Sequence, residues 1–169
     1  GIVPAGMEMM DKALIHATDN FSKAGYPRDA ESMLIVEVDG TISEVNEQIE
    51  RVKVIATKNN STSLKISNSE EERLRFWAGR KSAFPACGAM APDYYCMDGT
   101  IPRGKLAKVL NEISRLSKKY ELPVANAFHA GDGNLHPLIM FDANDPKSLA
   151  KTEKFGSAIL KYCVKVGGV

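Results

Sequence analysis

The sequence predicts an α+β domain in which an antiparallel or mixed sheet carries helices packed on one face. Short β-type runs alternate with segments of helical apolar spacing along the whole chain. Two of these runs, residues 123–129 and 135–141, follow each other directly and form a hairpin, which favours antiparallel pairing. The chain has 169 residues, 44% of them hydrophobic, which is enough for a single folded domain.

The first half of the chain is predicted to contain three helices and two strands. Ser43 and Ser69 each precede an apolar helical pattern and are typical N-cap residues. Three glutamates that follow Ser69 suit the positive end of a helix. The predicted elements are a helix over 7–21, a strand over 32–38, a helix from Ser43 that ends before Asn59, a strand over 63–66 and a helix from Ser69 to about 83, followed by a loop over 85–93.

The second half is predicted to hold the hairpin between two helices. A strand over 94–97 comes first, and Pro102 then suits the first turn of a helix that runs to about Tyr120. After the hairpin, Asp145-Pro146 opens a final helix that reaches about Val166.

The turn of the hairpin brings two of the three histidines together. Asp132-Gly133 is typical of a type I′ turn, and that turn places His129 directly opposite His136. Their Cβ atoms would lie roughly 4.5–5.5 Å apart on one face. Two such imidazoles can share a metal ion or grip a small anion, although two solvated histidines or a longer loop are alternatives. Pro137 would fall in a non-hydrogen-bonded pair, where its missing N–H is not needed.

Composition narrows the function. The formal net charge is +1 without a basic stripe, so nucleic acid is not an expected partner. The sequence lacks an apolar run near the roughly 20 residues of a membrane span. Cys87, Cys96 and Cys163 are odd in number and indicate free thiols in a reducing, cytoplasmic setting. The abrupt ends suggest a piece of a longer protein, and the chain carries no Gly-x-Gly-x-x-Gly loop that would cradle a cofactor unaided.

Residues 129–137 resemble the His-Ala-Gly-Asp-Gly-Asn-Leu-His-Pro signature of the FAD-linked oxidases that act on 2-hydroxy acids such as glycolate and D-lactate. The resemblance extends from the Glu8-Met9-Met10-Asp11 stretch to the terminal glycines and covers nearly the whole chain. It implies that residues 1–169 form one substrate-binding cap domain related to ferredoxin-like folds. The FAD-binding domain and the extreme C-terminal segment of the longer protein would then lie outside this chain.

The resemblance also implies substrate-binding residues. The segment from Trp77 to Lys81 is similar to the family's Trp-x-x-Arg-Lys stretch, in which the arginine holds the substrate carboxylate. The resemblance implies that Arg80 takes that role, which suits a guanidinium because it matches a carboxylate bidentately, and Lys81 is expected to face solvent. From residues alone, an arginine at a helix end such as Arg80 is usually a solvated cation that favours the helix C-terminus. Tyr95 and Asn134 are further candidates, with a half-buried structural tyrosine as the alternative for Tyr95.

Further positions carry weaker implications. Relatives that act on dicarboxylates carry a second cationic residue where this chain has Cys96. This difference disfavours a dicarboxylate substrate. The stretch from Glu8 to Asp11 is interpreted as structural or as a contact with the flavin domain. His16 is interpreted as an ordinary, partly exposed histidine.

His129 and His136 are also the expected ligands of a divalent metal, Zn, Mn or Fe. In metal-dependent family members, the third ligand is a glutamate of a Gly-Glu-His-Gly segment, and the histidine that follows it is the proposed base. This chain ends at Val169, before both. We therefore expect the isolated chain to bind metal weakly or not at all.

The resemblance implies that the whole protein moves a hydride from a 2-hydroxy acid to FAD, with His129 and His136 as catalytic residues. Its expected partners are the acid, the FAD-binding domain and other oxidase subunits, through which it would lie peripherally at the inner membrane. Two rivals remain. One is a metal hydrolase that uses His129, His136 and Asp132, and the other is a non-catalytic interaction domain.

Overall fold

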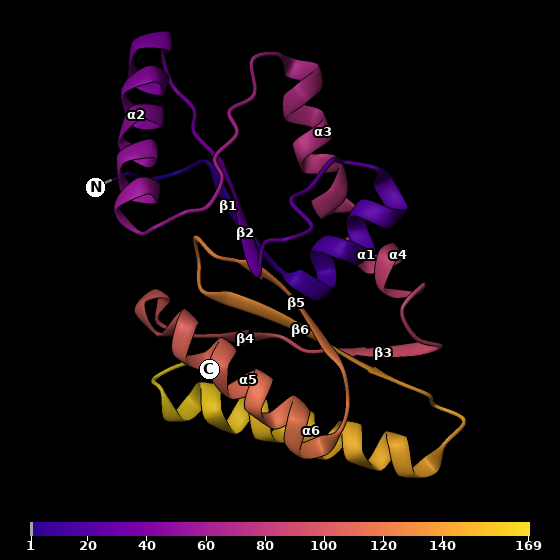
Figure 1. Ribbon diagram of the computed structural model, residues 1–169. Coiled ribbons are helices and arrows are strands. Elements are labelled where there is room, and N and C mark those ends of the chain that lie inside the picture. The colour runs from indigo at the N-terminus through magenta and orange to yellow at the C-terminus, as the bar shows by residue number, and fades with distance from the viewer. Residues whose placement is uncertain (1) are drawn as a thin grey trace.

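The strands form one antiparallel sheet in the order β2-β1-β5-β6-β3, and β4 pairs with β6 beyond β3 (Figure 1). This is a computed structural model, and it describes residues 2–169. The strands are β1 Gly6–Asp11, β2 Ser32–Glu37, β3 Asp93–Cys96, β4 Gly99–Thr100, β5 Val124–His129 and β6 Asn134–Phe141. The helices are α1 Lys12–Ser22, α2 Ile42–Lys58, α3 Glu70–Lys81, α4 Ala83–Cys87, the 3₁₀ turn η1 Arg103–Lys105, α5 Leu106–Tyr120 and α6 Pro146–Lys165.

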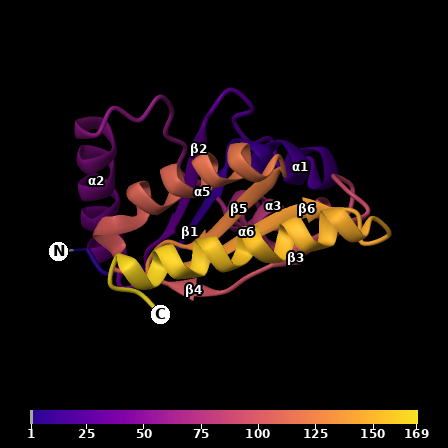
Figure 2. The ribbon, with the colours of Figure 1, turned by 90° about the horizontal axis from the view of Figure 1, so that it is seen from below.

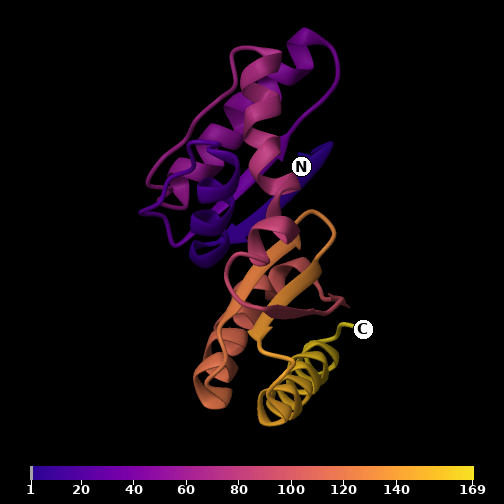
Figure 3. The ribbon, with the colours of Figure 1, turned by 90° about the vertical axis from the view of Figure 1, so that its right-hand side faces the viewer.

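The predicted α+β class with an antiparallel sheet is confirmed, but helices cover both faces of the sheet rather than one. Alternate residues of the hairpin β5–β6 enter two different cores, with α1, α3 and α4 above the hairpin and α5 and α6 below it (Figure 3). Both faces of β5 and β6 are apolar and buried, so each face needs its own cover. The upper core includes Met10, Leu14, Ile15, Ala125, Ala127 and Leu138, and the lower core includes Val109, Ile113, Phe128, Leu135, Ile139, Phe155 and Ile159.

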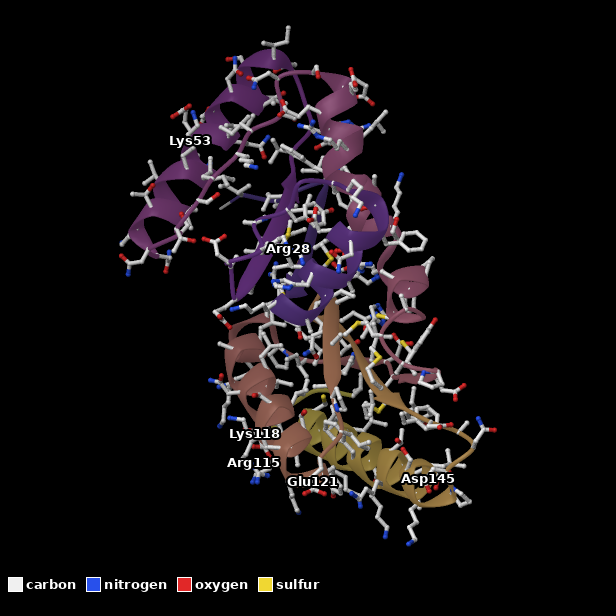
Figure 4. The ribbon with its side chains drawn as sticks, turned by 45° about the vertical axis from the view of Figure 1, so that its right-hand side comes forward. Arg28, Lys53, Arg115, Lys118, Glu121 and Asp145 are labelled. Carbon is white, nitrogen blue, oxygen red and sulfur yellow. The ribbon has the colours of Figure 1, made fainter. Side chains whose placement is uncertain are left out.

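Helices α5 and α6 lie side by side under the hairpin (Figure 2). Tyr120 of α5 stacks on Phe155 of α6, with 5.5 Å between ring centroids. Arg115 and Lys118 point outward from α5 into solvent, which leaves its apolar side for the sheet (Figure 4). By contrast, every residue of α2 stays at least partly exposed, and this helix stands beside β2.

The prediction of a helix over residues 7–21 is wrong in its first part. Residues 6–11 form β1, which pairs with β2 on one side and β5 on the other. Met7 and Met10 have helical spacing, yet two ladders of backbone hydrogen bonds outweigh such a short pattern. Helix α1 begins only after Asp11, whose carboxylate accepts a hydrogen bond from the Leu14 N–H at 3.0 Å. An N-cap aspartate at this position was the available signal.

Other boundaries differ in smaller ways. Residues 63–66 run as irregular chain and pair with no strand, although β2 is the edge strand of the sheet on that side. Helix α2 is capped by Thr41 in a capping box with Glu44, rather than by Ser43. The predicted Ser69 cap is confirmed, while α4 occupies part of the segment expected to be a loop.

Two further features concern the chain as a whole. Within residues 2–169, no helix has both the length and the apolar character needed to cross a membrane. Cys87, Cys96 and Cys163 are free cysteines.

Helix α3 is held against the loop after α1 by Tyr26. The Tyr26 hydroxyl donates to the Phe76 carbonyl and accepts from the Arg80 N–H at 3.0 Å, and burial raises the pKa of this phenol to about 12. The tyrosine ring lies so close to Gly79 that a Cβ there would overlap it. Gly79 therefore permits the approach that fixes the position of Arg80.

We predict that Gly79→Ala lowers the free energy of unfolding by about 1–3 kcal/mol, because the methyl group must displace a buried ring. Helix propensity alone predicts a gain of roughly 1 kcal/mol, so the two effects differ in sign. Urea unfolding of the chain measures the change. Gly104→Ala is the matched control, since its Cβ would meet open space. A Gly79→Ala protein as stable as the parent would contradict this packing.

Candidate functional site

The loop of the β5–β6 hairpin is longer than the predicted type I′ turn. His129 pairs with Asn134 and Ala127 pairs with His136, so Ala130 to Gly133 form the loop. Positive φ is found at Gly133 (75°), whereas Asp132 keeps an ordinary negative φ. The predicted direct opposition of the histidines is therefore wrong by a shift of two residues in register. An even shift preserves the face, so both rings still point to the same side.

Contacts from outside the hairpin explain the longer loop. The Gly131 N–H donates to the Met7 carbonyl of β1 at 3.2 Å, and the Ile101 N–H donates to the Gly133 carbonyl at 2.9 Å. A Cβ at Gly133 would overlap the Ile101 carbonyl oxygen, so this position requires glycine. These tertiary bonds favour the longer loop over the two-residue turn.

His129 and His136 are diagonal neighbours in the ladder. Their ring centroids lie 4.9 Å apart, and the two ring planes are nearly perpendicular at 89°. The His129 side chain is 43% exposed, while that of His136 is 13% exposed. The structure therefore brings together the two imidazoles that the sequence selected, although not in the predicted pairing.

Asp98 lies beside His136 in the short gap between β3 and β4 along β6. The Met140 N–H donates to the Pro123 carbonyl at 2.9 Å, and alternation from that pair makes Asn126–Pro137 a non-hydrogen-bonded pair, as predicted. The other edge of β6 faces the chain between β3 and β4. Pro137 has no N–H that it could donate to that chain. The registers on both sides of this gap place Asp98 opposite His136, and Asp98 Oδ1 lies 3.0 Å from His136 Nδ1.

Glu8 of β1 joins two of the predicted site residues. It stands opposite His129 in the β1–β5 ladder, and its Oε1 lies 2.7 Å from His129 Nδ1. Its Oε2 accepts a hydrogen bond from Arg80 Nε at 3.0 Å and lies 2.9 Å from Arg80 Nη2. The side chains of Arg80 and Glu8 are only 10% and 13% exposed, so this is a nearly buried ion pair.

These side chains form a continuous line across the face of the sheet, which we call the polar row. It consists of Arg80, Glu8, His129, His136 and Asp98. It crosses β1, β5, β6 and the gap between β3 and β4, and Arg80 reaches it from α3.

The other predicted residues lie around the polar row or away from it. Asn134 pairs with His129, and its side-chain Oδ1 is buried without a hydrogen-bond partner among residues 2–169. Lys81 is exposed, as expected. Tyr95 pairs with Ile139 on the opposite face and packs near Gly156 of α6. The structure does not bring Tyr95 to the histidines, so this geometry gives no support to a substrate-binding role for it.

Glu8 and Asp98 are the members of the row that the sequence did not select. The stretch that begins at Glu8 is interpreted above as structural or as a contact with the flavin domain, and the predicted helix over 7–21 conceals the place of Glu8 opposite His129. Recognition of residues 6–11 as a strand would point to Glu8, because the register of a strand pair determines which side chains lie opposite each other.

Burial controls the charge state of His136. It lowers the pKa of this ring below its usual value of 6.5, helped by His129 and Arg80 and opposed by the nearby Asp98 carboxylate. His136 is therefore a neutral imidazole at pH 7, the form that accepts a proton or binds a metal.

The polar row fits only part of a metal site. Two imidazoles are suitable ligands for a divalent transition metal. Among residues 2–169, no three His, Cys, Asp or Glu side chains are arranged to hold a metal ion. Asp132, the third ligand of the hydrolase alternative, is exposed in the hairpin loop. Among the described residues, two imidazoles are therefore the candidate ligands, which is fewer than a complete metal site needs.

The fold defines the class of domain. The structure of p-cresol methylhydroxylase with substrate bound matches with a TM-score of 0.63 and 12% identity, over 97% of this chain and 38% of that chain. A 4-ethylphenol oxidase from Gulosibacter chungangensis in complex with isoeugenol matches with a TM-score of 0.62 and 13% identity, over 96% of this chain and 38% of that one. At such identities the likeness shows a shared fold and leaves the substrate open.

The sequence defines the family. Residues 1–169 match the family model described as FAD linked oxidases, C-terminal domain. The chain therefore belongs to this family, which confirms the resemblance drawn from the hairpin signature.

Individual curated relatives are similar to this chain over nearly its whole length. The chain is 57% identical to the glycolate oxidase subunit GlcD of Escherichia coli strain K12 over 99% of its length, which is 34% of that protein. It is 29% identical to GlcD of Bacillus subtilis strain 168, over 99% of the chain and 36% of that protein. A mitochondrial D-lactate dehydrogenase (cytochrome) of Arabidopsis thaliana is 28% identical over 99% of the chain and 30% of its own length. The chain spans about a third of the length of these relatives.

We predict that the free energy of unfolding of the chain falls as the pH decreases below about 6.5. The lowered pKa of His136 means that the unfolded chain takes up a proton on this ring at a higher pH than the folded chain does. Urea unfolding at pH values between about 7.5 and 5.5 measures the slope. His136→Gln should decline less steeply, and Asp98→Asn more steeply because Asp98 raises this pKa. Equal slopes in the parent and His136→Gln would contradict the assignment.

Proposed function

We propose that this chain is the substrate-binding cap domain of a longer FAD-dependent oxidoreductase that oxidises a small 2-hydroxy acid, glycolate or D-lactate. The observation that carries the proposal is the polar row, in which Glu8 links an arginine to a pair of imidazoles on one face of the sheet. The identity of 57% to a glycolate oxidase subunit supports the choice of substrate class. The FAD-binding domain would be supplied by the rest of the longer protein.

Arg80 is the proposed anchor for the substrate carboxylate. Its contacts with Glu8 use Nε and Nη2, so a substrate would meet the guanidinium from the Nη1 side. A charged donor in a nearly buried position binds a carboxylate strongly because little water competes with it. The Asn134 side chain, whose Oδ1 has no hydrogen-bond partner among residues 2–169, supplies a further polar contact near His129.

The imidazoles are proposed to act on the hydroxyl group. Oxidation of a 2-hydroxy acid to a 2-oxo acid removes the hydroxyl proton and the α-hydrogen with its electron pair. FAD, when bound, supplies the hydride acceptor. One of the two imidazoles, His129 or His136, accepts the single hydrogen bond that the hydroxyl can donate and so positions it, while Arg80 fixes the carboxylate. The base that takes the proton is proposed to lie outside residues 1–169.

A divalent metal, Zn, Mn or Fe, belongs to this proposal with His129 and His136 as two of its ligands. Because the described residues offer only two ligands, we assign no step of the reaction to a metal.

The relatives named as oxidase subunits support a proposal that other subunits join the protein. A cytoplasmic setting and peripheral attachment at the inner membrane through those subunits stay predictions.

The two rivals are less well supported. A stand-alone hydrolase needs a complete metal centre, and residues 2–169 supply no third ligand. An interaction domain needs no nearly buried arginine beside paired imidazoles, and the desolvation of the Arg80–Glu8 pair means that stability alone does not explain it.

Replacement of the anchor tests the proposal. In the full-length protein, Arg80→Lys keeps the charge, but a lysine held by Glu8 offers a carboxylate only a point charge. Loss of hydrogen bonds to a charged group costs roughly 1.5–3 kcal/mol, so we expect the KM for glycolate or D-lactate to rise about 10- to 100-fold. Steady-state kinetics with an artificial electron acceptor measure the change.

Lys81→Ala is the matched control, since its side chain is the exposed neighbour of Arg80 on the same helix. Its kinetics should equal those of the parent. An unchanged KM in Arg80→Lys would favour the interaction-domain alternative.

A further inference from the structure

We propose that Glu8 is a positioning residue that sets the tautomer of His129 and orients Arg80 with the same carboxylate. The atom that His129 offers to the substrate or to a metal is then Nε2. The inference deepens the proposed function and rests on it for its chemical consequence. Its structural content, the location of one proton, is independent of that function.

The tautomer follows from what each group can donate. An ionised carboxylate only accepts hydrogen bonds, and a guanidinium only donates them. Because Glu8 Oε1 lies 2.7 Å from His129 Nδ1, that nitrogen must carry the hydrogen. A neutral imidazole carries one N–H, so Nε2 holds the free lone pair. Carboxylates that hold an imidazole in this way commonly orient metal-binding and catalytic histidines.

Glu8 is itself held firmly. Its backbone lies in β1 between Ile35 of β2 and His129 of β5. Its second oxygen is bound to the guanidinium of Arg80. The backbone N–H of Arg80 in turn donates to the Tyr26 hydroxyl. Rotation of the carboxylate away from His129 would also break a nearly buried ion pair, so the orientation of the imidazole is linked to that of the arginine.

Asp98 offers a built-in comparison. It also faces the Nδ1 atom of a histidine, His136, at 3.0 Å. Its side chain is 75% exposed, however, and no arginine holds its other oxygen in the way that Arg80 holds Glu8. An exposed carboxylate can turn freely, so Asp98 fixes its histidine less firmly than Glu8 does.

Glu8→Gln separates positioning from packing, because the two side chains have the same shape. Arg80 only donates hydrogen bonds, so the amide oxygen of the glutamine must face it. The amide NH₂ group then faces His129 Nδ1 and turns that nitrogen into an acceptor. We therefore expect the His129 proton to move to Nε2, which removes the lone pair offered to substrate or metal.

Nitrogen-15 spectra of the full-length protein with labelled histidines, recorded at about pH 8, locate the proton. His129 is assigned by comparison with His129→Gln. We expect Nδ1–H in the parent and Nε2–H in Glu8→Gln. His16 is the internal reference, since its Nε2 lies 2.6 Å from the Arg28 carbonyl, which only accepts, and so carries the hydrogen in every variant.

Two further variants complete the design. Glu8→Asp keeps an accepting carboxylate and should retain the parent tautomer. Asp98→Asn should leave the His136 tautomer unchanged, because nothing forces the orientation of its exposed amide.

In Glu8→Gln we also expect the affinity for Zn²⁺ and kcat to fall about 10- to 100-fold, the usual effect of losing such a carboxylate. KM should change less, because Arg80 keeps an oxygen partner.

The results separate the two proposals. Nε2–H in the parent, or Nδ1–H retained in Glu8→Gln, would overturn the positioning role whatever the activity. If Glu8→Gln does not fold, the parent spectrum and Glu8→Asp still decide the matter. If the tautomers are as expected but the bound flavin is not reduced by glycolate or D-lactate in the parent, the positioning role stands and the proposed function fails.

Discussion

The contact of one carboxylate with an arginine and a histidine is the constraint on which the arrangement of the site depends. Glu8 can make it only because β1 is an inner strand, paired on both sides, whose register places this residue opposite His129. On the other side, the ring of Tyr26 against Gly79 sets the position of α3 and so of Arg80. Three separate parts of the chain therefore meet at a single side chain.

The sequence predicted the parts of the molecule that local rules govern. Apolar periodicity predicts the strands of the hairpin, and capping preferences predict the Ser69 cap. The alternation of side chains along a strand predicts the shared face of His129 and His136. The sequence misjudged what long-range contacts decide. The hairpin loop is held open by bonds to Met7 and Ile101, and residues 6–11 form a strand because they have two partners. Glu8 was overlooked for the same reason, since its role exists only once β1 lies beside β5.

The division between fold and site also explains the comparisons. Two phenol-oxidising enzymes share this fold at 12% and 13% identity, so the sheet and its two helical layers do not select a substrate. In the proposed function, selection comes from the side chains of the polar row on one face of the sheet. An arginine and two imidazoles suit a small anion with a neighbouring hydroxyl, which agrees with the relatives named for glycolate and D-lactate.

The most direct measurement is an anaerobic titration of the full-length protein with glycolate and with D-lactate, followed by flavin absorbance. The account predicts that the flavin is bleached in the parent and stays oxidised in His129→Ala and His136→Ala, because these rings position the hydroxyl. A flavin that is bound but remains oxidised in the parent with both acids would contradict it, as would full bleaching in both histidine variants.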